Sequence, residues 1–219
     1  MAACKYYFGK VFAHLAGALA ISAASAEYSD IGAQLLPQSS VLIKFVVNLV
    51  IALGLLYGVL LTPPGSIPKY AFFIAFAFWL GQTLKPYVER LEDKGTLTRV
   101  LALTTGVFAA MTALGFYDSG NFLGLGPYLL AGLVGLISAQ LLLLALGTPE
   151  EKRKGFQWLQ IFGVALFSLF TAYDIQVLRG MAKLCSSRKN SPFQPDYPVA
   201  SLGIFLDFIN LFQSMGGNE

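Results

Sequence analysis

The sequence predicts an all-α integral membrane protein, built as a bundle of seven transmembrane helices. Its composition points to this class. Of the 219 residues, 56% are hydrophobic and 12% are charged, whereas a soluble domain has about 25% charged residues. So few charges cannot cover a surface that faces water. The apolar runs also lack the two-residue alternation of a membrane β-barrel, which leaves helices as the expected solution.

Seven apolar runs are expected to form the spans, because each comes close to the length that crosses about 30 Å of hydrocarbon. Turn-forming residues such as Pro63-Pro64-Gly65 and Gly147-Thr148-Pro149 separate them. We expect residues 1–219 to form a single polytopic membrane domain with the last helix central, since lipid would not tolerate the carboxyl of Asp207. In chain order the runs are approximately Val11–Ala26, Val41–Leu61, Tyr70–Leu84, Val100–Tyr117, Tyr128–Leu146, Trp158–Leu178 and Val199–Phe212.

The first run has a second interpretation. Lys5 and Lys10, an apolar stretch and then Ala24-Ser25-Ala26 are arranged like a secretory signal with its cleavage site. We expect the segment to stay in the protein as the first span. The orientation of the chain is not fixed by the sequence, because the numbers of Lys and Arg residues on the two sides of the membrane are tied.

Aromatic residues and cysteines give two smaller expectations. Aromatic rings near the span ends are expected in the headgroup layer; they are Tyr6, Tyr7, Tyr70, Tyr128, Trp158 and Tyr197. Cys4 and Cys185 lie far apart in the chain and form no spacing motif, so two free thiols are expected rather than a disulfide.

Four ionisable residues lie inside the spans, where such groups are costly and usually mark function. They are His14, Lys44, Asp174 and Asp207. Lys44 is near the start of its span, so its long side chain can reach the interface. His14 lies one turn inside the first span and is expected to make a structural hydrogen bond, with a proton site as the less favoured alternative. Both are kept as accessory candidates.

Asp174 and Asp207 are the main candidates, because a short acidic side chain cannot reach the interface from within an apolar helix. If the last two spans form an antiparallel hairpin, Asp174 lies ~16 Å and Asp207 ~14 Å below the connecting loop. At matched depth the two carboxyls can share one proton and titrate as a unit. When deprotonated they offer the hard oxygen ligands that suit Ca²⁺. The plain alternative is that each Asp hydrogen-bonds a neighbouring helix.

Glu89 is a further accessory candidate. It lies in a charged run with Glu92 and Asp93 that alternates with basic residues. We expect this run to be a solvated loop with weak ion pairs. Glu89 could also attract cations to a pore mouth.

Several motifs resemble the transmembrane Bax inhibitor motif family, over essentially the whole chain. The most specific is the C-terminal signature, Asp196-Tyr197 followed by Leu206–Phe212. The preceding span matches the family's aspartate–glutamine motif at Tyr173-Asp174-Ile175-Gln176. The segments Phe76–Gly81 and Ala113–Tyr117 are similar to its third and fourth spans.

The resemblance implies a bundle with a hydrophobic central seventh helix, acting as a pH-sensitive Ca²⁺ leak. The family's paired aspartates fall on Asp174 and Asp207. Some members have an arginine on the second span that latches to this pair; here Lys44 is the only base in that span. The resemblance also implies endoplasmic reticulum or Golgi membranes, or the plasma membrane of a bacterium, and suppression of cell death in eukaryotes.

Two other functions remain open. An intramembrane aspartyl protease also places a Tyr-Asp in one span and an Asp in the next. However, Phe205 stands where its Gly-x-Gly-Asp motif needs glycine, and its Pro-Ala-Leu motif is absent. We therefore expect no enzyme. A non-conducting scaffold for other membrane proteins is the second alternative. The expected partners are the lipid bilayer, Ca²⁺ as the permeant ion and possible membrane proteins, with no cofactor and no nucleic acid.

Overall fold

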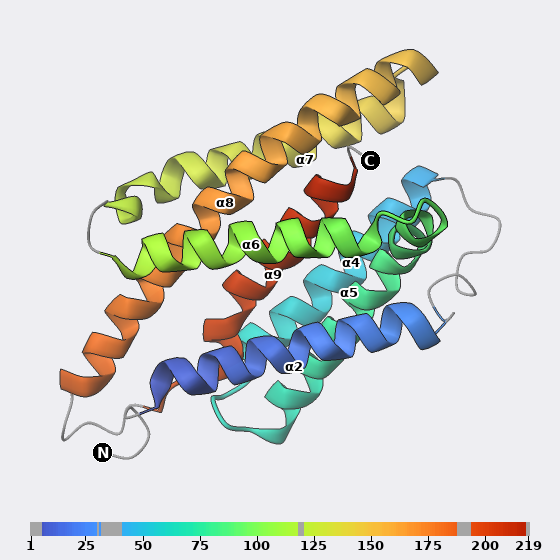
Figure 1. Cartoon of the computed structure of the whole chain (residues 1–219). Coiled ribbons are helices and arrows are strands. Elements are labelled where there is room, and N and C mark those ends of the chain that lie inside the picture. Colours follow the sequence, from blue (N-terminus) through green and yellow to red (C-terminus); the bar gives the residue numbers. More distant parts are fainter. Residues whose placement is uncertain (1–5, 30, 32–40, 118–120, 188–193, 218–219) are drawn as a thin grey trace. The chain divides into compact units, whose positions relative to one another are not determined.

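The computed structural model describes residues 6–29, 31, 41–117, 121–187 and 194–217. These residues form seven α-helices and one short 3-10 helix, with no strand among them, which confirms the all-α class (Figure 1). In chain order the elements are α2 (Tyr7–Tyr28), α4 (Val41–Leu61), α5 (Ile67–Asp93), α6 (Leu97–Phe116), η1 (Phe122–Leu125), α7 (Gly126–Leu146), α8 (Pro149–Ser187) and α9 (Tyr197–Gly216).

Six of the described α-helices are long and apolar enough to cross a membrane, by length and composition. The helix that falls short is α5, which carries Gln82, Lys85 and a charged end. Burial differs strongly between the six. Only 6% of the apolar window of α4 is buried, against 50% for α9, the largest share of the six. The last helix is therefore the most enclosed, as the sequence predicted.

Two helices extend beyond the spans predicted for them. α8 has 39 residues, about 58 Å, so it is longer than a hydrocarbon layer of about 30 Å. α5 continues through Pro86 as far as Asp93, although a proline inside a helix removes one hydrogen bond and crowds the carbonyl four residues earlier. The prediction of a loop around Glu89 was therefore wrong: Glu89, Glu92 and Asp93 are helical. Oε1 of Glu89 lies 3.8 Å from Nζ of Lys85, one turn earlier.

The chain divides into two compact units, and each unit is built from two separate stretches. The first unit combines Met1–Glu89 with Gly180–Phe205, and the second combines Arg90–Arg179 with Leu206–Glu219. α8 and α9 each contribute residues to both. The single domain predicted for residues 1–219 stays a prediction.

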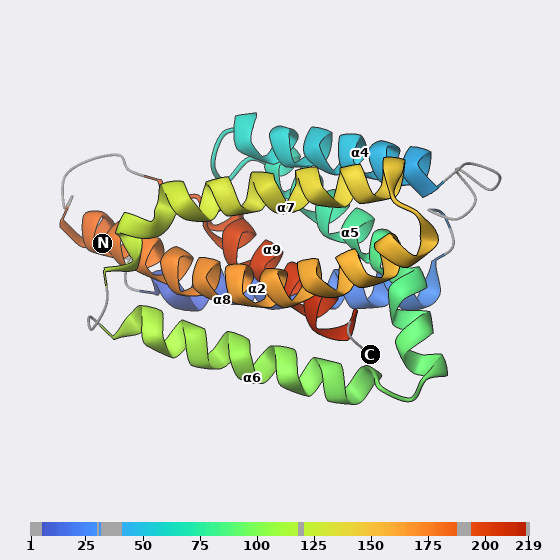
Figure 2. The same cartoon turned by 90° about the horizontal axis from the view of Figure 1, so that it is seen from above.

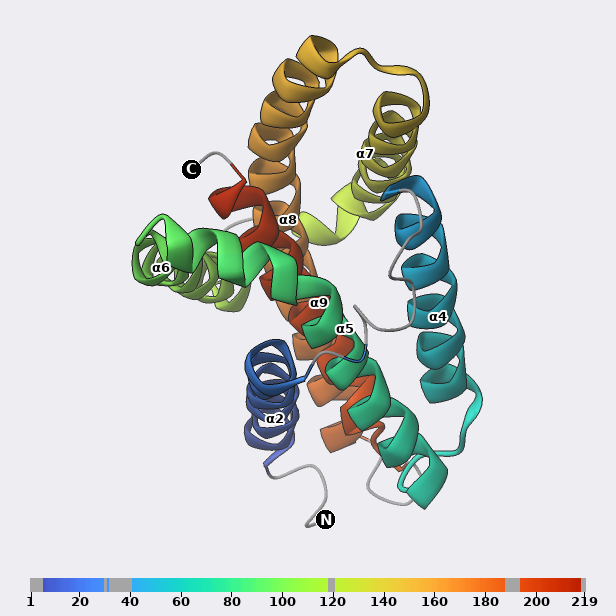
Figure 3. The same ribbon diagram turned by 90° about the vertical axis from the view of Figure 1, so that its right-hand side faces the viewer.

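In the first unit, α2 and α5 lie side by side and are joined by polar side chains (Figure 3). Ser22 Oγ donates to the carbonyl of Ala77 at 2.7 Å, and Ser25 Oγ donates to that of Phe78 at 2.8 Å. A Cβ on Gly81 would collide with the carbonyl oxygen of Ser22. Ser25 and Ala26, two of the three residues that resemble a signal cleavage site, are thus buried on the packing face of the first span, whereas Ala24 is exposed.

The α4–α5 hairpin of the first unit closes through a tight turn. Gly65 in this turn has φ +75°, a left-handed conformation that suits glycine. Further along, a Cβ on Gly58 would lie 2.6 Å from the ring of Phe72. The missing side chain of Gly58 therefore makes room for an aromatic ring of α5.

In the second unit, α7 and α8 form an antiparallel pair joined by a short turn (Figure 2). Two glycines allow the close approach. A Cβ on Gly132 would lie 2.9 Å from Leu166, and one on Gly155 would lie 2.6 Å from Leu143. The turn is closed by reciprocal capping, because Thr148 Oγ1 donates to Glu151 at 2.8 Å and accepts from its backbone N–H.

Two of the smaller expectations need correction. Cys185 is disulfide-bonded rather than a free thiol, and Cys4 lies outside the described residues. Among the aromatic rings, Tyr6 and Tyr128 are exposed near helix ends as expected. Trp158 is exposed too, but it lies well inside α8, which begins at Pro149. Tyr7 and Tyr197 are buried and contact one another. The aromatic contact removes these two rings from the lipid interface.

Candidate functional site

Asp207 lies on α9 with its side chain enclosed. Only 5% of the residue is exposed, and Oδ2 is buried without a hydrogen-bond partner in the described part of the chain. Its neighbours on the helix, Leu206 and Phe208, are apolar. Burying a carboxyl without a partner is costly, so such a group in an apolar helix requires a reason beyond packing.

Asp174 provides that reason. It is half-buried on α8 and belongs, like Asp207, to the second unit. The two carboxyls are near enough for their charges to interact. Both residues paired by sequence reasoning thus lie in the second unit, and their action as one site stays a prediction. Oδ2 of Asp207 makes no hydrogen bond, so a shared proton would not be held through this oxygen in the structure described.

The residues around Asp174 pack closely against glycines of the neighbouring helices. The carbonyl of Ala172 and the side chain of Ile175 would lie 2.8 and 2.7 Å from a Cβ on Gly115 of α6. The ring of Tyr173 would lie 3.1 Å from a Cβ on Gly126. The Tyr-Asp-Ile-Gln motif therefore fits against glycines of α6 and α7.

The last residue of that motif makes a polar contact. Gln176 Oε1 accepts a hydrogen bond from the backbone N–H of Phe122 at 2.9 Å. Phe122 begins η1, the short helix that leads into α7. Gln176 therefore ties the α6–α7 connection to the helix that carries Asp174.

The part of α9 that carries Asp207 is also held on two sides. The rings of Phe208 and Phe108 meet edge to face, with centroids 5.3 Å apart. About two turns beyond Asp207, Ser214 Oγ would lie 2.5 Å from a Cβ on Gly163 of α8. Both carboxyls therefore sit on helices fixed by close packing, which is how a functional site keeps its geometry.

The three accessory candidates belong to the first unit, while the aspartate pair belongs to the second. His14 stacks between Tyr70 and Tyr197, with ring centroids 5.9 and 6.0 Å away. Its Nδ1 donates to the carbonyl of Lys10 at 2.7 Å, so it makes the structural hydrogen bond expected for it. Lys44 is half-buried on α4. Glu89 is 58% exposed beside Lys85.

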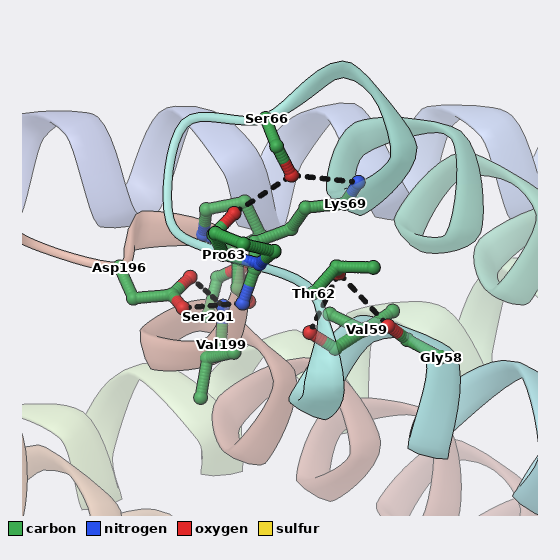
Figure 4. A network of polar contacts seen from close by, with 10 residues as sticks. Gly58, Val59, Thr62, Pro63, Ser66, Lys69, Asp196, Val199 and Ser201 are labelled. Carbon is green, nitrogen blue, oxygen red and sulfur yellow. Dashed lines mark hydrogen bonds and ion pairs between the residues drawn. The ribbon is translucent and has the colours of Figure 1, made fainter.

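Sequence reasoning missed one charged pair. Lys69 is 1% exposed, and its Nζ forms an ion pair with Oδ2 of Asp196 (Figure 4). Both residues belong to the first unit. The sequence drew attention to Asp196 through the C-terminal signature, but Lys69, directly after Pro68, could equally be an ordinary charge in a loop.

No group of three or more His, Cys, Asp or Glu side chains comes together among the residues described. The aspartate pair therefore supplies two carboxylates only. A calcium ion, which takes six to eight oxygen ligands, would need water and backbone oxygens as well.

Comparison with known proteins identifies the family. The family model described as "Inhibitor of apoptosis-promoting Bax1" matches residues 4–216. The chain belongs to the Bax inhibitor family. This membership covers both aspartates and confirms the resemblance noted in the motifs, and it makes the chain a member of a family of membrane proteins.

Relatives within the Bax inhibitor family come from bacteria and yeast. An uncharacterized protein of Borreliella burgdorferi is 30% identical over 213 residues, which are 94% of this chain and 88% of that protein. The inner membrane protein YbhL of Escherichia coli K12 is 28% identical over 64% of this chain. Bax inhibitor 1 of Schizosaccharomyces pombe is 30% identical over 76% of this chain. The alignment covers 58% of each of the last two proteins.

Proposed function

We propose that this chain is a pH-sensitive Ca²⁺ leak channel in which Asp174 and Asp207 form the proton sensor and part of the ion path. One observation carries the proposal. Asp207 is buried in an apolar helix, one of its oxygens has no partner, and its charge interacts with that of Asp174. Intramembrane carboxyls in this arrangement are typical of proton relays and ion pathways.

The chemistry follows from competition between a proton and a cation for the same oxygens. At low pH the pair holds a proton and the path is closed. Full deprotonation places two like charges in a poorly solvated site, where unit charges 4 Å apart repel by about 4 kcal/mol at an effective dielectric near 20. Separating the helices or admitting a cation relieves this repulsion. The pH then shifts the population between closed and open states.

The proposal extends to membrane and physiology. In a eukaryotic cell we place the chain in the endoplasmic reticulum or Golgi membrane, and in a bacterium in the plasma membrane. The names of the family and of the fission yeast relative refer to inhibition of Bax. A Ca²⁺ leak that lowers the content of an internal store would suppress cell death in a eukaryotic cell. The chain acts without enzymatic chemistry and without a cofactor, and other membrane proteins are its further partners.

The direct test is Ca²⁺ efflux from liposomes that contain only the purified protein. Wild type should leak more as pH rises, because deprotonation opens the path. Asp207→Asn and Asp174→Asn should each flatten the pH response and weaken Ca²⁺ permeation, since the switch needs both members. Asp93→Asn removes an exposed carboxylate at the end of α5 and should behave like wild type.

The proposal is contradicted if a folded Asp174→Asn/Asp207→Asn double variant leaks Ca²⁺ with unchanged pH dependence. The gate would then lie elsewhere, and His14 would be the next residue to test. Equal flux through wild type and Glu89→Gln would remove Glu89 from the ion path.

A further inference from the structure

The beginning of α9 is held by an unusual concentration of polar and aromatic contacts, all of them within the first unit. The most buried is the ion pair between Lys69, in the first turn of α5, and Asp196, which immediately precedes α9 (Figure 4). The two residues are 127 positions apart in the chain. Lys69 is 1% exposed, so its charge depends on Asp196 for compensation.

The carboxylate of Asp196 has two partners, the ammonium of Lys69 and a backbone N–H of α9. While Oδ2 contacts Lys69, Oδ1 accepts a hydrogen bond from the backbone N–H of Val199 at 3.2 Å. Asp196 therefore occupies the N-cap position of α9. There a carboxylate accepts a hydrogen bond from a backbone N–H that has no partner within the helix, and its negative charge interacts favourably with the helix dipole. Because Pro198 has no N–H, this bond to Val199 is the one through which the cap can act. The same side chain thus starts α9 and fastens it to α5.

Two further contacts surround this point. The α4–α5 turn approaches the segment before Asp196 so closely that a Cβ on Gly65 would collide with the amide of Gln194. On the other side, Tyr197 meets rings of α2, with centroids 5.8 Å from Tyr7 and 6.0 Å from His14. The first residue of α9 is therefore fixed against α2 while its cap is fixed against α5.

The ion pair and the proposed site are connected by α9, which begins directly after Asp196 and carries Asp207. α9 is continuous from Tyr197 to Gly216, and Asp207 follows Asp196 by 11 residues, about 16 Å along the axis. Close packing constrains the part of α9 near Asp207, but apolar contacts are less directional than a charged pair, which tolerates few alternative partners. A charged pair at its start specifies one register, a recognised use of buried polar groups.

We propose that Lys69 and Asp196 are positioning residues: their buried ion pair fixes the rotation and axial position of α9, and with them the place at which Asp207 is presented. This inference rests on the proposed function of Asp207. It assigns no contact between the ion pair and the permeant ion. Its effect is on how readily the helix leaves the closed position.

The test uses the full chain in lipid nanodiscs and in liposomes, with two readouts. Hydrogen exchange at the backbone amides of residues 200–204 reports how firmly α9 starts. The pH profile of Ca²⁺ efflux reports the site. Lys69→Met should speed exchange at these amides at least tenfold and raise the leak severalfold at the pH where wild type is closed. Lys69→Arg, which keeps the charge, should restore both.

Two other variants control for folding and for charge. If Lys69→Met leaves Asp196 unpaired and fails to fold, Lys69→Met/Asp196→Asn removes both charges, and asparagine keeps the cap. This double variant should fold and still show the shifted pH profile. Lys94→Met removes an exposed lysine just after α5 and should match wild type in both readouts.

The outcomes separate the inference from the function on which it rests. If the amides of residues 200–204 exchange at the wild-type rate in both Lys69→Met and the double variant, the ion pair does not hold the start of α9 and the inference is overturned. If these amides exchange faster but the pH profile of Ca²⁺ efflux is unchanged, the ion pair holds the start of α9 without positioning Asp207. This result overturns the inference and leaves the proposed channel function intact. If wild type conducts no Ca²⁺, the proposed function fails together with the positioning role, and exchange alone decides whether the pair fixes the start of α9.

Discussion

At the scale of single residues, Gly115 determines how closely α6 approaches the segment that carries Asp174. A Cβ at this position would lie 2.8 Å from the carbonyl of Ala172 and 2.7 Å from Cβ of Ile175. Ala172 and Ile175 lie on either side of Asp174 on α8. Neither the backbone carbonyl nor Cβ is the end of a flexible side chain that could move away. Any side chain at Gly115 must therefore push the two helices apart.

We expect Gly115→Ala to lower the free energy of unfolding by about 1–3 kcal/mol, the usual cost of overpacking a tight site. Thermal unfolding in detergent, followed by circular dichroism, measures this loss. Gly106→Ala is the matched control on the same helix, because nothing lies within 4 Å of its Cβ. It should be neutral or slightly stabilising, since alanine favours helix. Equal melting temperatures for the two variants would show that α6 does not pack on α8 at Gly115.

Residues differ in how much of their role the sequence reveals. Asp174 and Asp207 could be selected because a carboxylate inside an apolar run is an anomaly that needs no partner to be noticed. Asp196 stands in the C-terminal signature, but its pairing with Lys69 could not be predicted, because each of the two lies beside a turn where charge is ordinary. Their significance comes from a contact across 127 positions, and no local pattern encodes it.

At the scale of the helices, α2 and α5 are joined by a seam of small and polar residues. Ser25 is central to it, since its hydroxyl donates to Phe78 and accepts from the amide of Gln82, both within 2.8 Å. Inside a membrane such bonds hold helices together because lipid offers no competing partner. The sequence predicted a span here but could not reveal the seam, since its Ala-Ser run also matches a cleavage site.

Ser25→Ala should weaken the association of these two helices by about 0.6 kcal/mol and by no more than about 1.7 kcal/mol, the mean and the maximum measured for interhelical hydrogen bonds in a membrane protein. The readout is the free energy of unfolding in mixed micelles. Ala24→Ser adds a hydroxyl to an exposed position on the same turn and should leave the stability unchanged. A loss for Ala24→Ser as large as that for Ser25→Ala would indicate an effect on helix propensity rather than on the seam.

At the scale of the whole molecule, the helices divide by how much apolar surface they expose. α4 leaves large apolar side chains exposed, among them Val50, Leu53 and Leu61. α5 is the helix whose composition falls short of a span, and its aromatic residues Phe73, Phe76 and Trp79 are buried instead. A helix with polar and charged residues at membrane depth is tolerated only where protein encloses it. Its span could be predicted from length, but its enclosure depends on contacts that appear only in three dimensions.

The two tryptophans of the chain test this division without any introduced probe. Trp79 on α5 is 8% exposed, whereas Trp158 on α8 is 73% exposed. In bilayers that contain brominated lipid, Trp79→Phe leaves Trp158 as the emitter, and its fluorescence should be strongly quenched. Trp158→Phe leaves Trp79, which should be quenched severalfold less, because bromine must approach an indole closely. Equal quenching of the two single-tryptophan proteins would mean that lipid reaches α5, and α5 would then have to bear its polar residues in hydrocarbon without enclosure.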